Sequence, residues 1–298
     1  MPSAISRRVS FFEQLRLTLL SQQWFTSILF KMPRFLRWTL RSLYFAPLDL
    51  ADHLSGRKDP TVPPRWINFT GAVTDLPASR EELKHNLIKF AGLQPTCRIL
   101  EIGCGFGRLA VAMATYLDKD GAYHGIDIVR SAIKWCGRSI HGPHGNITFS
   151  HADIINAEYN PRGHIPASKY KIQAPDESYD IVVLVSVFTH MLPTEVDHYL
   201  SEIARVLKPG GRCYATYSII TEQAISRMSS GVASLNFRYQ LGDCWVMNTS
   251  VPELGVGYEE SYLRHLHASH NLKFDLHCGN WSLGLGPGSQ DIIVARRI

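Results

Sequence analysis

Three glycines at alternate positions, Gly103, Gly105 and Gly107, stand between an apolar run and a helical pattern. The whole segment reads RILEIGCGFGRL over residues 98–109. Glycine allows a positive φ and has no Cβ to keep a ligand away from the backbone. The helix that follows offers free N–H groups to a polar or anionic ligand. The segment therefore predicts a strand, a glycine-rich turn and a helix that together bind a nucleoside-containing cofactor.

The spacing of these glycines narrows the choice of cofactor. A dinucleotide fingerprint is G-x-G-x-x-G, whereas the third glycine here comes one residue earlier, and Glu101 precedes the first glycine by two positions. No G-x-x-x-x-G-K-[ST] sequence occurs, which excludes a P-loop. The E-x-G-x-G-x-G pattern resembles motif I of the class I S-adenosylmethionine (AdoMet) methyltransferases. A nicotinamide dehydrogenase is an alternative that the spacing disfavours.

The resemblance implies a role for each residue of this turn. The glycines would pack against the amino-acid and ribose portion of AdoMet, and the Glu101 carboxylate would hold its ammonium group, often through water. A structural alternative stays open for Gly103 and Gly107, which would also allow a helix to pack tightly on the sheet. Glu101 lies between apolar neighbours, so its carboxylate needs a partner in any case.

An acidic residue marks the end of the second predicted strand. Residues 123–128 form a strand pattern in which Asp127 comes 20 residues after Gly107 and is followed by Ile128. A carboxylate at this strand tip can accept hydrogen bonds from both ribose hydroxyls of a nucleoside. We therefore predict that Asp127 and Ile128 contact the cofactor. The alternative for Asp127 is a role as the N-cap of the next helix.

The third predicted strand, residues 147–149, leads into two further candidate residues. It runs into Asp153 and Ile154, and the resemblance implies that the acid faces the adenine amino group. Acids are common at strand ends, so a structural role remains the alternative for Asp153. The resemblance thus assigns both residues to the adenine end of an AdoMet site.

The remaining patterns complete an α/β fold. Residues 179–185 are a near-continuous β-branched run, as expected for a strand buried on both faces. Further elements follow in order: a helix over 195–207, and strands over 212–218, 272–277 and 291–296. The resembling family closes its sheet with such a final pair. We predict a doubly wound, seven-stranded, mostly parallel sheet with an antiparallel last strand over residues 85–298.

The segment after the fourth strand, Ser186 to His190, reads S-V-F-T-H and is the best candidate for the acceptor side. Ligands of open α/β sheets sit at the carboxyl ends of the strands, and the resemblance implies that the methyl group points at this segment, with Ser186 among the cofactor contacts. A neutral imidazole near pH 7 can take the proton that a methylated hydroxyl loses. His190 is therefore a candidate general base. Its alternative is a structural role in the turn before Pro193.

Two absences bear on the acceptor and on metals. The Asn/Asp-Pro-Pro-aromatic motif of methyltransferases that act on the amino groups of adenine or glutamine is missing, which argues against nucleobase N-methylation.

The six cysteines form no C-x-x-C pair and are typical of reduced thiols in a cytosolic protein. His265, His267 and His270 have a spacing that does not bring three imidazoles to one helical face. We predict no metal site and a solvated helix there.

Residues 219–259 are too long for a simple loop between a strand and a helix. They contain the aromatic residues Phe237, Tyr239, Trp245 and Tyr258. In the resembling family an insertion at this place often walls the acceptor pocket, which would suit an apolar or ring-bearing acceptor. A small satellite core is the equal alternative.

Positive charge gathers at the N-terminus. Residues 1–45 contain seven Lys or Arg and one acid, a net charge of +6, and the remaining 24 basic and 25 acidic residues give −1. Arg34, Arg37 and Arg41 form a basic stripe beside an apolar stripe of Leu36, Leu40 and Leu43. This pattern is typical of an amphipathic helix on an anionic membrane surface. A helical lid over the active site is the alternative.

The N-terminal extension is predicted to end in a connector. Residues 1–84 would form a basic amphipathic helical extension and this connector, which begins at residue 46. Asp75 to Pro77 predict a turn, and Ser79 an N-cap for a helix over residues 80–90. The longest apolar run of the extension, residues 24–30, is far too short to span a membrane.

These observations together predict an enzyme, an AdoMet-dependent methyltransferase with AdoMet as its cofactor. The favoured reaction is O-methylation of a small or lipid-like acceptor. The alternatives are C- or N-methylation of a small metabolite, and a non-catalytic AdoMet-binding partner protein. No nucleic-acid partner is expected, because the overall charge is modest and no separate basic module occurs. The expected location is cytoplasmic, with peripheral membrane contact through residues 1–45; the oligomeric state stays open.

Overall fold

The structure is a computed structural model. It describes residue 32 and residues 34–56, 59–68, 76–156, 159–231, 233, 235–283 and 290–298, so the predictions for residues 1–31 lie outside the described residues. The chain divides into two compact units, residues 1–71 and residues 72–298.

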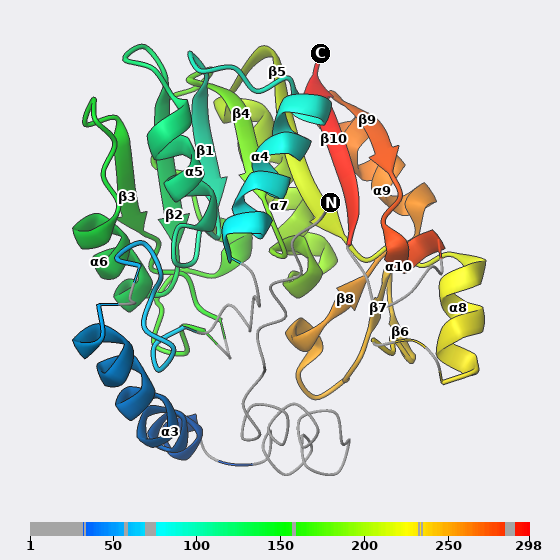
Figure 1. Cartoon of the computed structure of the whole chain (residues 1–298). Coiled ribbons are helices and arrows are strands. Elements are labelled where there is room, and N and C mark those ends of the chain that lie inside the picture. Colours follow the sequence, from blue (N-terminus) through cyan, green and yellow to red (C-terminus); the bar gives the residue numbers. More distant parts are fainter. Residues whose placement is uncertain are drawn as a thin grey trace, which may run out of the picture. The chain divides into compact units, whose positions relative to one another are not determined.

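The second unit is built on a seven-stranded sheet with the strand order β3-β2-β1-β4-β5-β10-β9 (Figure 1). The strands are β1 (Arg98–Ile102), β2 (Ala122–Asp127), β3 (Ile147–His151), β4 (Tyr179–Leu184), β5 (Leu207–Tyr217), β9 (Leu272–His277) and β10 (Asp291–Arg297). All pairs are parallel except those of β10, which runs antiparallel to β5 and β9. The predicted doubly wound α/β sheet is confirmed. The order reverses between β1 and β4, where such folds bind their ligands.

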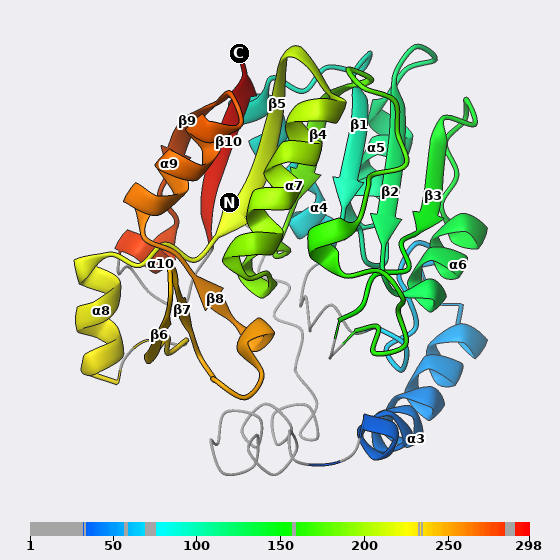
Figure 2. The same ribbon diagram turned by 180° about the vertical axis from the view of Figure 1, so that it is seen from behind.

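Helices cover both faces of this sheet. One layer consists of α4 (Leu76–Ala91), α5 (Arg108–Tyr116) and α6 (Arg130–Ser139), and the other of α7 (Pro193–Val206) and α9 (Glu260–Ser269). Figure 1 looks onto the first layer, and Figure 2 onto the second. Neighbouring strand residues alternate between two cores, so that Ile99 packs under α5 and Leu100 under α7. Burial on both faces explains the continuous apolar strands.

The segment over residues 219–259 folds into a small subdomain within the second unit. It contains α8 (Glu222–Ser229), η3 (Pro252–Leu254) and an antiparallel sheet of β6 (Tyr239–Leu241), β7 (Cys244–Val246) and β8 (Val256–Gly257). Figure 1 shows this sheet beyond the carboxyl end of β5. One face joins the core under α7, and the Tyr258 hydroxyl donates to the Met191 carbonyl oxygen at 2.5 Å.

The start of α4 differs from the start predicted by the local sequence pattern. The turn over residues 75–77 and the N-cap at Ser79 are wrong, because the helix begins at Leu76 and Ser79 lies within it. The Ser79 hydroxyl instead accepts a hydrogen bond from the Arg108 guanidinium at 2.8 Å, across to the first turn of α5. A long-range contact therefore uses the serine that looks like a local cap.

The expectation of a solvated helix is wrong for one of the three histidines. His265 is exposed in α9, but His267 is fully buried, and its ring packs edge-on against Phe274 at 5.1 Å between centroids. Its Nδ1 lies 2.8 Å from the Leu263 carbonyl oxygen. Burial lowers the pKa of His267 to about 4. Within the described ranges, no three His, Cys, Asp or Glu side chains are arranged to hold a metal ion.

The first unit contains one described helix, α3 (Arg34–Leu54), which continues through Pro47 beyond the predicted connector start. The predicted basic stripe is wrong for Arg41, whose Nε donates to the Arg65 carbonyl oxygen at 3.1 Å and whose Nη2 donates to the Asn68 carbonyl oxygen. None of the described helices combines the length and apolar composition needed to cross a membrane.

Candidate active site

The glycine-rich turn follows β1 at the reversal point of the sheet. Gly103, Gly105 and Gly107 have φ values of 75°, 53° and 69°, a region that residues with a side chain rarely adopt. A Cβ on Gly103 would lie 2.4 Å from Val187 Cγ2, and one on Gly107 would lie 2.4 Å from Ile140 Cδ1. Glycine is therefore required at these two positions both by backbone conformation and by space.

Asp127 fixes this turn from the end of β2. Its Oδ2 accepts a hydrogen bond from the Gly105 N–H at 2.7 Å, and its Oδ1 accepts one from the Val129 N–H at 2.7 Å. The side chain is buried, and this burial raises its pKa. Asp127 is not the N-cap of α6, because Val129 holds that position. Each carboxylate oxygen accepts more than one hydrogen bond, which leaves capacity for hydroxyl donors of a ligand.

Glu101 finds its partner inside the protein. Its side chain is 4% exposed, and the Tyr123 hydroxyl donates to its Oε2. Burial raises the pKa of Glu101 to about 7, opposed by the Tyr123 hydrogen bond and by the positive charge of Arg108. The nearby Asp127 carboxylate acts in the same direction as burial. A cation bound at the turn would favour the ionised form of this carboxyl group.

The residues predicted for the adenine end lie at the ends of β2 and β3. Ile128 is half-buried, and Ile154 is 5% exposed. The Asp153 carboxylate lies 2.6 Å from His164 Nδ1, a partner that lowers its pKa. His164 belongs to a long β3–β4 connection, which folds back so that Ile154 bridges Ile165. The sequence patterns did not predict this connection.

Ser186 lies two residues after the end of β4, in a strained conformation. Its φ is 57°, an unfavourable value for a residue with a side chain, and such strain concentrates at functional sites. The Ser186 N–H donates to Thr216 Oγ1 at 2.8 Å, and its hydroxyl donates to Gln290 Oε1 at 2.9 Å. The Thr216 hydroxyl also donates to Gln290 Oε1, at 2.6 Å. Residues from three strand ends thus hold the strained backbone in place.

Thr216 and Gln290 were missed in the sequence. Neither belongs to a motif, and they are 74 positions apart. The only available signal was the antiparallel last strand, which brings its first residues to the edge where the preceding strand ends. Within the described part of the chain, the Gln290 amide nitrogen Nε2 makes no hydrogen bond, so its two N–H donors are available for a ligand.

His190 lies in η2 (Phe188–His190), directly after Ser186 and Val187. Its Nδ1 is 2.8 Å from the Glu253 carbonyl oxygen. Because a carbonyl oxygen only accepts, the proton sits on Nδ1 and the lone pair is on Nε2. The half-buried ring lies edge-on to Tyr159, with 6.2 Å between the ring centroids. In the neutral form of this ring, Nε2 is therefore the nitrogen that can accept a proton.

The aromatic residues of the insertion pack mostly into cores. The Phe237 ring lies edge-on to Trp281 at 5.5 Å, and the Trp281 indole N–H donates to the Ile219 carbonyl oxygen at 3.0 Å. Tyr258 is fully buried, whereas Tyr239 is 47% exposed. These contacts correspond to the satellite-core alternative.

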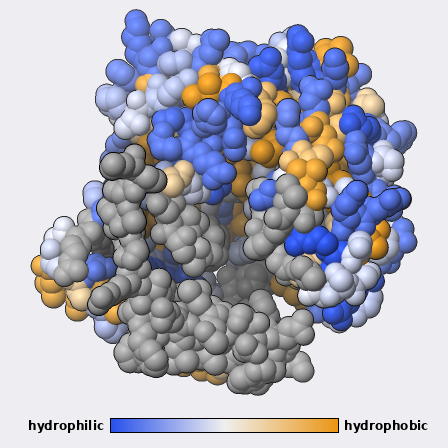
Figure 3. All heavy atoms as spheres, turned by 45° about the vertical axis from the view of Figure 1, so that its right-hand side comes forward, coloured by the Kyte–Doolittle hydropathy of each residue, from blue (hydrophilic) through white to orange (hydrophobic). Residues whose placement is uncertain are grey.

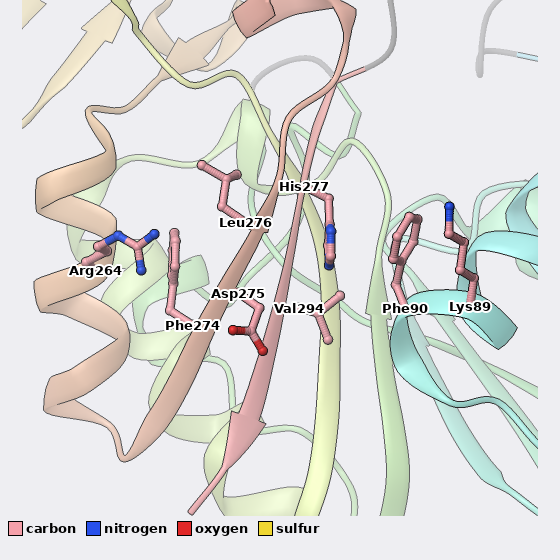
Figure 4. Close-up of a pocket in the computed structure, with 8 residues that line it drawn as sticks. All are labelled: Lys89, Phe90, Arg264, Phe274, Asp275, Leu276, His277 and Val294. Atoms are coloured by element: carbon pink, nitrogen blue, oxygen red, sulfur yellow. The ribbon is translucent and has the colours of Figure 1, made fainter.

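A separate shallow groove of about 480 Å³ runs along the outer edge strand β9 (Figure 4). Arg264 covers the Phe274 ring at 4.4 Å, and the Phe90 and His277 rings lie 4.2 Å apart. Figure 3 shows hydrophobic and hydrophilic residues mixed over this side of the second unit. Because β9 is at the far edge of the sheet, the groove is distinct from the site at β1 and β4.

Comparison with known proteins shows which proteins this chain is similar to. Residues 99–211 match the family model described as a methyltransferase domain. The chain has the fold of a SAM-dependent methyltransferase from Methanosarcina mazei, with a TM-score of 0.50 and 20% sequence identity over 72% of this chain and 97% of that one.

Three curated relatives carry different acceptors in their names. A tRNA N(3)-cytidine methyltransferase of Gallus gallus is 26% identical over 47% of this chain and 36% of its own length. A phthiotriol/phenolphthiotriol dimycocerosates methyltransferase of Mycobacterium ulcerans is 32% identical over 38% and 35%, and a fatty-acid O-methyltransferase of Mycolicibacterium smegmatis is 30% identical over 38% and 34%. The chain therefore spans about a third of the length of these relatives.

Proposed function

We propose that this chain, which carries a class I AdoMet-dependent methyltransferase domain with AdoMet as its cofactor, methylates an oxygen atom of a small or lipid-like acceptor. One observation carries the proposal: His190, four residues after the strained Ser186, is held through Nδ1 by the Glu253 carbonyl oxygen, so that the lone pair of its neutral form lies on Nε2. The carboxyl ends of the strands are where an open α/β sheet presents its ligands.

The residues at the end of β1 fit AdoMet. Gly103 and Gly107 give the turn its positive φ values and its close packing against Val187 and Ile140, which a Cβ would prevent. We assign the ribose hydroxyls to Asp127 and the charge of the ammonium group to Glu101. Two buried carboxylates suit a ligand that carries a sulfonium and an ammonium group, because each stabilises nearby positive charge.

We assign the adenine end of the cofactor to the next strand ends. Ile128 and Ile154 offer apolar side chains for the ring, and Asp153 offers a carboxylate for its amino group. The hydrogen bond between Asp153 and His164 holds this carboxylate in place and keeps it ionised. The Asp153 carboxylate is thus held in position for the adenine amino group by His164.

His190 would accept the acceptor's proton. Bound AdoMet supplies a methyl group on a positively charged sulfur, which needs no further activation. A hydroxyl acceptor loses its proton as it is methylated, and His190 Nε2 can take that proton. The Glu253 carbonyl holds the Nδ1 proton in place throughout, which keeps the tautomer and the ring orientation fixed.

Gln290 is proposed as a positioning residue on the same side. Its Oε1 is occupied by the hydroxyls of Ser186 and Thr216, which fixes the orientation of the amide. The two N–H groups of Nε2 can then donate to an oxygen of the acceptor or of the cofactor carboxylate. A small displacement of the acceptor or the cofactor should lower the rate of methyl transfer strongly, because the orientation of the reactants supplies much of that rate.

A lipid-like acceptor and a peripheral position at a membrane belong to this proposal. Two of the relatives are named for fatty-acid or dimycocerosate acceptors, and the N-terminal segment carries a net charge of +6. The motif expected for adenine or glutamine N-methylation is absent from the sequence. Methylation of a carbon or nitrogen of a small metabolite, and AdoMet binding without turnover, are the alternatives.

The test is transfer of label from methyl-labelled AdoMet into an extract separated into lipid, aqueous small-molecule and RNA fractions. We expect label in the lipid fraction with the wild-type chain and none with Asp127→Ala. Label in the RNA would refute the proposed acceptor class. Intact AdoMet binding without label in any fraction would favour the non-catalytic alternative.

A further inference from the structure

We propose that the apolar face of α3 is a docking surface for an anionic lipid membrane. We call this face the α3 stripe, and it consists of Leu40, Leu43, Tyr44, Leu50 and Leu54. The proposal goes beyond methyl transfer and does not depend on it, because it concerns a surface of the first unit alone.

The α3 stripe follows the helical repeat. Its members recur at intervals of three or four residues, or of six to seven across two turns, which places them on one side of a helix. Their side chains are exposed to an unusual degree: Leu40 48%, Leu43 70%, Tyr44 39%, Leu50 57% and Leu54 78%. Scattered single apolar residues are normal on a surface, but a contiguous row marks an interaction site.

The opposite side of α3 already has partners within the first unit. Phe45 is 7% exposed, and the Arg41 guanidinium lies over its ring at 5.4 Å. Arg65 pairs with Asp49 at 3.1 Å and with Asp52 at 2.7 Å. The helix is therefore held in one orientation by its polar side, and the α3 stripe is the side without such contacts in the described part of this unit.

These ion pairs also decide the charge of the exposed face. The acids of α3, Asp49 and Asp52, are both paired with Arg65 on the flank away from the stripe. The α3 stripe therefore carries no acid that would repel a negative surface. The chain up to residue 45 has a net charge of +6. An apolar face beside a basic segment suits the interface of an anionic bilayer, whereas two such segments would repel each other in a dimer.

The structure changes which residues are expected to bind lipid. Arg41 was part of the basic stripe in the sequence, but its guanidinium is engaged by the Arg65 and Asn68 carbonyl oxygens. The α3 stripe in turn extends nine residues past residue 45, to Leu54. The C-terminal half of α3 should therefore contribute as much to membrane binding as the basic N-terminal half.

The test is sedimentation of the full-length chain with phosphatidylcholine vesicles, with and without phosphatidylserine. The variant is Leu43→Glu/Leu54→Glu, at the two most exposed positions of the stripe. The matched control is Leu241→Glu, a leucine that is 45% exposed in β6 of the second unit. We expect wild type and control to sediment with the anionic vesicles, and the double variant to bind at least about tenfold more weakly.

Calorimetric AdoMet binding and helix content by circular dichroism are measured for the same samples. If the double variant loses helix content, Leu43→Gln/Leu54→Gln replaces it and should show the same weakening. Undiminished vesicle binding by a folded double variant would overturn the proposal. A wild-type dimer in lipid-free ultracentrifugation that the double variant loses would also overturn it, because a second copy would then be the occupant. Neither result depends on methyl transfer.

Discussion

The proposed site at the carboxyl edge of the sheet has a cofactor half and an acceptor half, and the two are built differently. On the cofactor half, the hydrogen bonds of Gly105 to Asp127 and of Tyr123 to Glu101 each join residues 22 positions apart. On the acceptor half, the contact of His190 with Glu253 spans 63 positions, and that of Ser186 with Gln290 spans 104. One half is a single strand–helix–strand unit, while the other is assembled from distant segments.

The chemistry of the halves differs as well. The cofactor half contains buried carboxylates whose pKa values burial raises, and backbone N–H groups. The acceptor half presents hydroxyls, an amide and an imidazole, and no carboxylate is assigned to it. The acceptor half can therefore change with little effect on the cofactor half. Relatives named for tRNA cytidine and for fatty acids illustrate how far acceptors diverge around such a domain.

The largest expected effect comes from breaking the cofactor half at Asp127. Asp127→Ala removes the acceptor for the Gly105 and Val129 N–H groups, and each buried donor left unpaired costs about 1–3 kcal/mol. We expect AdoMet affinity to fall by about 100-fold or more, since the proposed ribose contact is lost with the turn geometry. Calorimetry measures it. Asp118→Ala is the matched control, because the half-buried Asp118 also accepts two backbone N–H groups, in the loop before β2. Affinity of Asp127→Ala within a few-fold of wild type would contradict the assignment.

Breaking the acceptor half at His190 should leave the cofactor half intact. General-base catalysis contributes about 10²–10⁴-fold, so His190→Ala should lower kcat by about 100-fold at unchanged AdoMet affinity. His265→Ala, an exposed histidine in α9, is the matched control. Near-normal turnover of His190→Ala would restrict this residue to a structural role in the η2 turn.

Positioning by Gln290 should give a smaller effect. Gln290→Leu removes the acceptor of two hydroxyls and the proposed donors, and we expect kcat to fall about tenfold with the AdoMet dissociation constant unchanged. Thr216→Val should act through the same network, so the effects of the two changes should not be additive in a double-mutant cycle. Additive losses would show that the two side chains act independently.

The smallest effect on binding is expected at Glu101, where stability gives the clearer readout. The pKa of Glu101 is about 7 in the folded chain, above the ordinary value of 4.5. Between pH 4.5 and pH 7, Glu101 is therefore protonated in the folded chain and ionised in the unfolded chain. Stability therefore falls as pH rises from about 4.5 to 7. Since a tenfold change in proton affinity corresponds to about 1.4 kcal/mol, the loss is roughly 3 kcal/mol at most.

Glu101→Gln can still accept the Tyr123 hydroxyl but carries no charge, so it should remove most of this pH dependence and raise the melting temperature at pH 8. It should also bind AdoMet and its demethylated product a few-fold more weakly, and to the same extent, because both carry the ammonium group assigned to Glu101. Melting curves across pH and calorimetry with both ligands measure these effects. Undiminished binding of both ligands by Glu101→Gln would contradict the contact of Glu101 with the ammonium group.

The contrast between the halves explains what the sequence could predict. The glycine turn and Asp127 could be predicted because the positions that need a positive φ and the end of β2 lie close together in the sequence. The partner of Glu101, Tyr123, lies one strand away on the same face, at a register that parallel pairing fixes only after folding. Gln290 and Thr216 carry no local pattern at all, and their role follows from the meeting of β5 and β10.

The wrong predictions have the same origin. Ser79 has the residue type of a helix cap, but it is engaged by Arg108. Arg41 fits a solvent-facing basic stripe, but backbone carbonyls of a later segment bind it. His267 shares α9 with the exposed His265, but tertiary packing buries it. In each case a contact made at long range replaces the local role that the residue type favours.

The most direct test of the central claim is the bond that carries the transferred methyl group. The chain is incubated with ¹³C-methyl AdoMet and a lipid extract, and the product methyl carbon is examined by NMR, whose chemical shift distinguishes methyl groups on oxygen, nitrogen and carbon. We predict a resonance of an oxygen-bound methyl group that forms about 100-fold more slowly with His190→Ala and with Asp127→Ala. A methyl resonance on nitrogen or carbon, or one that forms at the wild-type rate with His190→Ala, would contradict the account.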